Sequence, residues 1–273
     1  MSATASPTQP PIAHSSGHSH QSTRAAVLDL SRKIGLGQEL EALPERVEFR
    51  HNRLLEQYQS NLEAVVKHAV AGSNSEIASH ELDPDWWHQF SQLAEQIHNP
   101  KMQKLWGQIL TVELAQPRSF GFKALDALKR MNHRDAQLLL TAVSLSGRFD
   151  QDPNPIIVTG WRSDPAWGGL IAAAGEQLPL TTLGLPYSAI LTLRELGLLH
   201  AVEMETGTLP QRPLTLQLRS RPLQLQPQNA RVHLRYYRFS HSGEELSKLL
   251  QQETPNDYIA ALLTLGSKAL RWS

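Results

Sequence analysis

The stretch from residue 83 to residue 131 constrains the fold most, because helix start and stop signals follow one another closely there. Asp83 can cap a helix that begins at Pro84, since aspartate accepts hydrogen bonds from free amides and proline is tolerated in a first turn. Asn99-Pro100 ends this helix and starts a second, which Pro117 ends. The pattern predicts three tightly connected helices.

Glu113 stands in line with the apolar face of the second helix, and a buried carboxylate is costly unless it is paired or hydrogen-bonded. We interpret it as a structural carboxylate that accepts hydrogen bonds from the amides of the helix near Ser119, or that pairs with a nearby cation. The candidate cations are Arg118, Lys123 and Arg130. The alternative is a general base or a metal ligand, but no second carboxylate or histidine stands beside it at ligand spacing.

A long amphipathic helix is predicted from Pro44 to about residue 71, because apolar residues recur there at intervals of three, four and seven. This stripe consists of Leu40, Leu43, Val47, Leu54, Tyr58, Leu62, Val65 and Ala69. The spacing suits a bundle member or a coiled-coil arm that joins two copies of the chain. The polar break at Arg50 to Arg53 favours the bundle, and a homo-oligomer through the helix 44–71 is the alternative.

The second half of the chain has a different pattern. Residues 148–185 are rich in Gly and Pro and contain one short strand candidate, Ile156 to Thr159. From Pro186 onward, a helix, alternating strands at Leu214–Leu218 and Val232–Tyr236, and a further helix follow in the order of the second half of a winged-helix unit. A last amphipathic helix is expected from residue 257 to residue 270.

These patterns together predict a mostly α fold: a helical bundle core followed by a small, winged-helix-like α+β unit. The predicted organisation is a disordered tail (1–22), a helical domain (23–147), a connecting segment (148–185) and a small α+β domain with a C-terminal helix (186–273). The tail has too few large apolar residues to offset the entropy of ordering. Its His14, His18 and His20 could bind a transition metal, but we interpret them as part of a solvated tail and expect no metal site.

Composition excludes several classes of protein. Lys plus Arg and Asp plus Glu number 26 each, so no overall charge attracts nucleic acid or an anionic membrane. The chain has no cysteine, which excludes disulfides, thiol nucleophiles and cysteine-ligated metals and suits the cytoplasm. No secretory signal is visible, and the apolar runs are shorter than the ~20 residues that span a bilayer. We therefore expect a cytoplasmic protein with no membrane partner.

One segment has a strong local excess of positive charge. Between Thr206 and Gly243 there are six arginines and no acidic residue: Arg212, Arg219, Arg221, Arg231, Arg235 and Arg238. On a β-hairpin such arginines could contact phosphates, which makes nucleic-acid binding one interpretation. The other is a solvated sheet edge, or a surface that meets an acidic patch elsewhere on the same protein.

No familiar catalytic motif is present. The sequence lacks a phosphate-binding glycine loop followed by lysine, a HExxH helix, a GxSxG elbow and a dinucleotide fingerprint. We therefore expect no catalytic residue and no cofactor, and interpret the protein as non-enzymatic.

Several short runs resemble a bacterial family of uncharacterised proteins that is similar to the Abi-alpha type, which is suspected of abortive-infection phage defence. The runs are Arg50-His51-Asn52, Asn61 to Val65, Asp85-Trp86, Met102 to Leu110 with Glu113 and Pro117, and Phe239 to Leu250. The resemblance covers about residues 38–255 and departs at Gly121. It implies a mainly helical intracellular protein with no established catalytic residue and no known cofactor.

The function that these observations favour is a non-enzymatic cytoplasmic interaction or regulatory protein, linked through the resemblance to stress or phage defence. Its partner is expected to be a protein. The alternative is a nucleic-acid-binding regulator that uses the arginine-rich hairpin.

Overall fold

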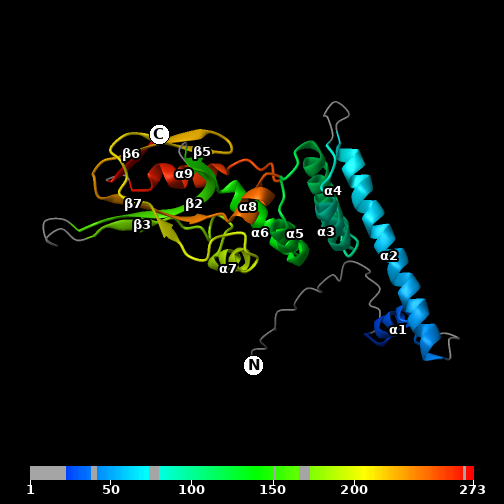
Figure 1. Cartoon of the computed structure of the whole chain (residues 1–273). Helices are drawn as coiled ribbons and strands as arrows, with labels where there is room; N and C mark the ends of the chain where they lie inside the picture. The colour runs from blue at the N-terminus through cyan, green and yellow to red at the C-terminus, as the bar shows by residue number, and fades with distance from the viewer. Residues whose placement is uncertain (1–22, 38–41, 74–79, 150–151, 166–172, 267–268) are drawn as a thin grey trace, which may run out of the picture. The chain divides into compact units, whose positions relative to one another are not determined.

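A computed structural model describes residues 23–37, 42–73, 80–149, 152–165, 173–266 and 269–273 (Figure 1). Helices occupy most of its first half. Their bounds are α1 Thr23–Lys33, α2 Leu43–Gly72, α3 Pro84–Ala94, α4 Pro100–Ala115, α5 Phe122–Arg130, α6 His133–Ser144, α7 Tyr187–Glu195, α8 His241–Ser247 and α9 Asn256–Thr264. The predicted disordered tail, with its three histidines, lies outside the described residues.

The helix starts follow from capping side chains. The carboxylate of Asp83 accepts hydrogen bonds from the amides of Asp85 and Trp86, and Asn99 caps α4 in the same way. Asn132 and Asp135 form a reciprocal capping box at the start of α6. The predicted caps of the first two helices in this stretch are therefore confirmed.

The second half is built on an eight-stranded antiparallel sheet, in the order β4-β7-β2-β1-β5-β6-β8 with β3 also paired to β2 (Figure 1). Its strands are β1 Gly147–Phe149, β2 Asp152–Ser163, β3 Gly175–Gln177, β4 Met204–Glu205, β5 Leu214–Leu218, β6 Pro222–Pro227, β7 Val232–Arg238 and β8 Leu270–Trp272. Buried residues alternate along β6, where Leu223 and Leu225 face the core.

The predicted mostly α fold with a winged-helix-like unit is wrong, because this sheet makes the protein a mixed α/β fold. The two strands expected to form one hairpin do not pair: β5 pairs with β1 and β6, and β7 pairs with β2 and β4. The twelve-residue strand β2 lies in the segment predicted to be a connection. Its glycine and prolines weaken the local strand pattern, and its partners are distant in sequence. The expected last helix ends at Thr264, and residues 270–272 form β8 instead.

The chain divides into two compact units, residues 1–57 and residues 58–273, and α2 runs across the boundary. In the first unit, α1 ends at a turn in which Gly35 and Gly37 both have positive φ. A Cβ on Gly35 would lie 3.2 Å from the ring of Phe49, so the turn packs closely on α2. No residue of α1 is buried.

The second unit has a continuous core. In its helical part, Phe90 stacks on Trp86 and contacts Trp106 at a ring-centroid distance of 5.3 Å. Across the sheet, the hydroxyl of Tyr258 in α9 lies within hydrogen-bond distance of the amide and the carbonyl of Val158, at 3.2 and 3.3 Å. These contacts fix helices and strands to one another inside this unit. The predicted domain boundaries after residues 147 and 185 stay predictions.

Candidate functional site

The six arginines of the predicted basic segment fall into two groups. Three of them are held by contacts within the chain. Arg219 donates to the carbonyls of Leu250 and Ser247 at 2.5 and 2.9 Å. Arg235 pairs with Glu203 and Glu205, and Arg238 pairs with Asp152 at 2.9 Å.

The other three arginines are placed differently. Arg212 and Arg221 are exposed and Arg231 is half-buried, and their side chains make no hydrogen bond or ion pair within the described ranges. The acidic partners of Arg235 and Arg238 come from segments outside the basic run, so the charge excess seen in the sequence is partly neutralised in the fold. Half of the predicted cations stay open to a ligand.

A network of charged side chains joins β2, β4 and β7. Arg162 donates to Asp164 at 2.5 Å and to Glu205 at 2.6 Å. Asp164 also lies 2.8 Å from Nε2 of His233, and Nδ1 of the same ring lies 3.0 Å from the carbonyl of Thr206. The hydrogen bond with Asp164, followed by that to Thr206, raises the pKa of the buried His233. Hydrogen bonds from His233 and Arg162 lower the pKa of Asp164.

This network is poorly suited to acid–base catalysis. Both ring nitrogens of His233 face acceptors, which favours the charged imidazolium and leaves neither nitrogen to take a proton from a substrate. Asp164 and Glu205 are in turn held by Arg162. The sequence signal for the network was weak, because Asp164 and His233 lie 69 residues apart.

The buried residues Glu113 and Glu245 hold the turn between α4 and α5. The carboxylate of Glu113 accepts from the amides of Arg118, Ser119 and Phe120 at 2.6, 3.0 and 3.1 Å. Glu245 in α8 accepts from the amide of Gly121 at 3.1 Å. Within the described residues no group of three or more His, Asp or Glu side chains could hold a metal ion. These contacts suit a structural role for Glu113, which stays a prediction.

The hydrogen bonds of Glu113 explain the backbone of the turn. Arg118 has a φ of 66°, an unusual conformation for a residue with a side chain, and its amide is held by the carboxylate. Trp86 closes the same turn from α3, because its indole donates to the carbonyl of Phe120 at 2.8 Å. The turn is therefore fixed from three helices, α3, α4 and α8.

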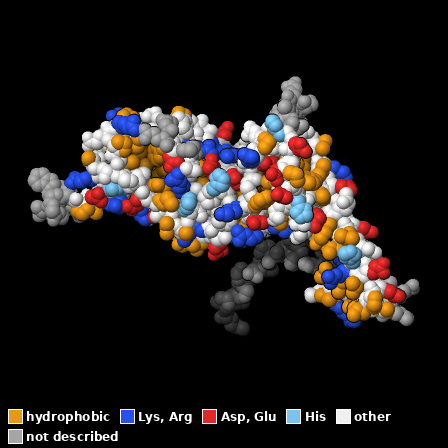
Figure 2. Space-filling view, in the orientation of Figure 1, with side chains coloured by type: hydrophobic (Ala, Val, Ile, Leu, Met, Phe, Trp, Pro, Cys, Tyr) orange, Lys and Arg blue, Asp and Glu red, His pale blue; other side chains and the backbone are white. Residues whose placement is uncertain are grey.

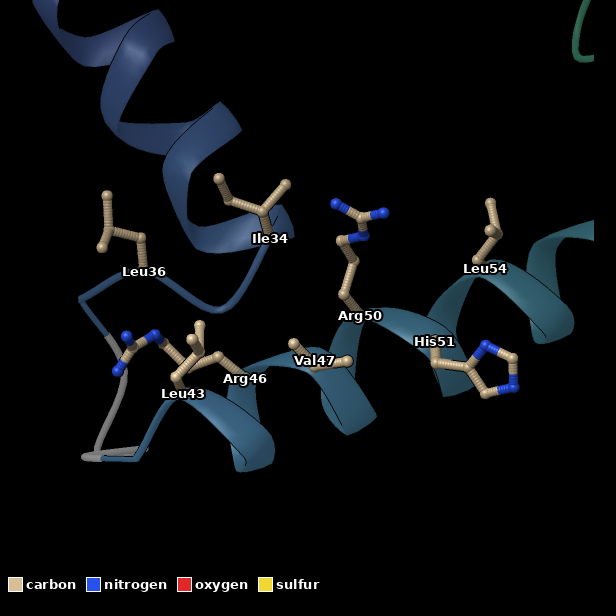
Figure 3. A pocket seen from close by; sticks show the side chains of 8 residues that line it. All are labelled: Ile34, Leu36, Leu43, Arg46, Val47, Arg50, His51 and Leu54. Carbon is tan, nitrogen blue, oxygen red and sulfur yellow. The ribbon is translucent and has the colours of Figure 1, made fainter.

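A groove of about 360 Å³ lies between the end of α1 and the start of α2, and we call it the arm groove (Figure 3). It is lined by Ile34, Leu36, Leu43, Arg46, Val47, Arg50, His51 and Leu54. In Figure 3 the side chains of Arg50 and Leu54 rise from α2 on the side where Ile34 lies. Its apolar side chains are exposed: Leu43 is 65% and Val47 is 59% accessible.

The arm groove occupies the first half of the predicted apolar stripe. In the second half of α2, Val65 and Ala69 of this stripe are buried against the helices of the second unit. The change from exposed to buried apolar residues along α2 falls near the polar break from Arg50 to Arg53. This break is the feature of the sequence that could have indicated the change. Figure 2 shows apolar, basic, acidic and His side chains together over the region where Figure 1 places α1 and the start of α2.

The fold defines a mixed α/β protein in which α1 and the start of α2 expose apolar side chains. The chain belongs to a family described as protein of unknown function (DUF2806), which matches residues 45–263. The predicted membership of an uncharacterised family is confirmed, whereas the similarity to Abi-alpha type proteins is not shown. No curated protein and no solved structure matches the chain. No helix in the described ranges is both long and apolar enough to cross a bilayer.

Proposed function

We propose that the protein is a non-enzymatic interaction protein, and that the arm groove binds an acidic amphipathic helix of a partner protein. The observation that supports this is the apolar stripe of Leu43, Val47 and Leu54, which the described residues of the first unit leave exposed. Contiguous apolar surface bordered by charge is typical of an interaction site. Helix-in-groove recognition needs apolar anchors at the spacing that these residues have.

The charge of the arm groove determines which kind of partner helix it can bind. The charged or titratable side chains that line the arm groove are Arg46, Arg50 and His51, and none of the lining residues is acidic. A helix with glutamates or aspartates beside its apolar face would place negative charge next to these side chains.

Two other occupants fit less well. In a two-fold pairing of two copies, the same basic surface would meet itself, so arginines would face arginines. The chain's own residues 1–22 contain no acidic side chain to complement the groove. The proposal therefore commits to a partner helix with acidic edges.

Two synthetic helical peptides test this proposal. Both carry leucines at positions i, i+3, i+4 and i+7, and one has glutamates and the other lysines at the flanking positions. In fluorescence anisotropy titrations with the full chain, the acidic peptide is expected to bind at least about tenfold more tightly. Arg50→Glu should reverse this preference, and Val47→Asp should abolish binding of both peptides.

Val70→Asp is the matched control, because Val70 is 69% exposed on the same helix but does not line the arm groove. It should leave peptide binding unchanged. Equal affinity for the two peptides, or no effect of Val47→Asp, would overturn the proposal. So would a dimer in light scattering that Val47→Asp dissociates, because the groove would then bind a second copy.

We further propose a cytoplasmic setting and a regulatory role in stress or phage defence. The cysteine-free sequence supports the setting, and the sequence resemblance alone supports the role. A deletion strain should lose resistance in a phage challenge, and the Val47→Asp variant should fail to restore it. A deletion strain that resists phage like its parent would contradict the defence role.

A further inference from the structure

A second cavity, of about 340 Å³, lies on the sheet in the other unit, far from the arm groove in sequence. Its apolar wall comes from Leu178, Leu180, Leu185 and Ile190, which belong to α7 and to the segment between β3 and α7. Its polar side comes from Thr159 of β2, Tyr237 of β7 and Glu203 just before β4. The volume lies within the range of small-molecule sites, which begins at about 300 Å³.

Among the described residues that line this cavity, Glu203 alone has a charged side chain. One carboxylate oxygen accepts from the hydroxyl of Thr159 at 2.5 Å, and the other accepts from Arg235. A carboxylate has about four acceptor sites, so these two bonds leave capacity for a donor in the cavity.

Tyr237 supplies a second polar group. Its residue surface is only 8% exposed, yet its hydroxyl makes no hydrogen bond within the described part of the chain. The hydroxyl atom itself is not fully buried, so a ligand in the cavity can reach it. Burial, and then the charge of Glu203, raise the pKa of Tyr237 more than the neighbouring Arg194 and Arg235 lower it, so the hydroxyl stays protonated.

The backbone is irregular at the same place. The pairing of β2 with β7 shifts register between Val158 and Gly160, so Thr159 lies in a β-bulge. A bulge re-aims a side chain, and here the Thr159 hydroxyl points to Glu203. On the other side, the amide of Leu178 donates to the carbonyl of Thr159 at 2.7 Å, which ties the cavity wall to the bulge.

We propose that this cavity binds a small organic amine with an apolar body. The ammonium group donates to the carboxylate of Glu203 and to the hydroxyl oxygen of Tyr237 and lies beside the rings of Tyr237 and Tyr187, while the apolar body contacts the leucines and Ile190. Tyr187 is 60% exposed, which places it at the mouth of the cavity. A cation beside two aromatic rings and one carboxylate combines cation–π attraction with a charge-assisted hydrogen bond. This site is independent of the proposed function of the arm groove.

Three probes of the same size test the proposal: phenethylamine, phenethyl alcohol and phenylacetate. Each is titrated into the ¹⁵N-labelled full chain, and the amide shifts of Thr159 and Leu178 are followed. The amine is expected to bind most tightly, the alcohol about tenfold more weakly, and the carboxylate not at all. Shifts that do not saturate with the amine, or a carboxylate that binds as tightly, would overturn the proposal.

Two variants separate binding from folding. Tyr237→Phe removes a hydroxyl that makes no hydrogen bond to any described residue, so the fold should persist while amine affinity falls about threefold to tenfold. Tyr236→Phe, the neighbour on the same strand outside the cavity lining, is the matched control and should have no effect. Glu203→Gln should weaken the amine about tenfold and leave the alcohol unchanged. Unchanged amine affinity in both Tyr237→Phe and Glu203→Gln would refute the site.

Discussion

The arm, which consists of α1 and the first half of α2, exposes large apolar side chains, whereas the sheet buries them. In the arm, Leu43 and Val47 are mostly exposed, whereas Leu225 and Leu234 of the sheet are fully buried. The sheet also pairs several of its charges internally, as in Arg238 with Asp152. A region that buries its apolar residues is stable by itself, but a region that exposes them gains stability when a partner covers them. This difference supports the proposal that the arm carries the interaction surface.

The largest effect on stability is expected when one leucine from each region is replaced and the two variants are compared. Leu234→Ala removes a fully buried side chain from β7 and should lower the free energy of unfolding by about 2–5 kcal/mol. Leu43→Ala, at a residue that is 65% exposed, should change it by less than about 0.5 kcal/mol. Urea unfolding followed by circular dichroism measures both. A cost for Leu43→Ala close to that for Leu234→Ala would show that the arm is already covered in the isolated protein.

A smaller effect is expected at the turn between α4 and α5. In the protein, the two carboxylate oxygens of Glu113 accept hydrogen bonds from three amides, and Glu113→Gln leaves only one carbonyl oxygen to accept them. The substitution should therefore lower the free energy of unfolding by about 2–3 kcal/mol. Glu63→Gln is the matched control, because Glu63 is exposed on α2 and is paired only along the helix surface, with Gln59 and Lys67. A Glu113→Gln protein with unchanged stability would contradict the structural interpretation of this carboxylate.

The arginines give a third comparison, now within the second unit. Arg235→Gln should cost about 1 kcal/mol because it breaks the half-buried pair with Glu203, and Arg221→Gln should cost less than about 0.5 kcal/mol. Thermal unfolding of the two variants measures the difference. Equal effects would mean that the ion pair with Glu203 does not stabilise the fold.

The division of the six arginines into three with internal partners and three without such partners among the described residues also limits how the protein could bind nucleic acid. If the protein binds DNA through the basic segment, Arg212, Arg221 and Arg231 are the arginines of that segment open to phosphates, so log Kd should change with log salt with a slope of about 3. A fluorescent duplex titrated at several salt concentrations gives this slope. A slope of about 6 would show that Arg219, Arg235 and Arg238 leave their internal partners, and the triple glutamine variant of the three open arginines should abolish binding altogether.

How much of the fold could be predicted from the sequence depends on how far apart in the chain the interacting residues lie. The caps Asp83 and Asn99 act within three residues, so the sequence is sufficient to place α3 and α4. The sheet was missed because β2 pairs with β7 across about 80 residues, and no local pattern encodes that pairing.

The candidate sites could likewise be predicted only where the residues that form them are close in sequence. The arginine cluster was visible in the sequence, but its partners Glu203 and Asp152 lie outside it, and Asp152 is 86 residues from Arg238. The sequence predicts an apolar stripe along α2 with a polar break at Arg50 to Arg53, and of this stripe the fold buries only Val65 and Ala69, at its far end. Burial depends on what packs against a helix, which its own periodicity does not specify.

The smallest expected effect concerns pH and the pair of His233 with Asp164. The folded pKa of His233 lies above its ordinary value of 6.5, so the charged ring contributes stability that is complete below that pH. This contribution is lost as the pH rises through the folded pKa. Asp164 acts at the acid end, where its lowered pKa contributes stability above 3.8 that disappears as the pH falls.

Unfolding measured at a series of pH values should therefore show a decline in stability on the alkaline side of pH 6.5 that Asp164→Asn reduces. Asp29→Asn, which alters only an exposed pair in α1, should leave the decline intact. The contrast places a pH-dependent term in the sheet and none in the arm. If Asp29→Asn changed the profile as much as Asp164→Asn, the charges of the arm would contribute to folding as those of the sheet do, and the distinction between an interaction surface and a self-sufficient region would fail.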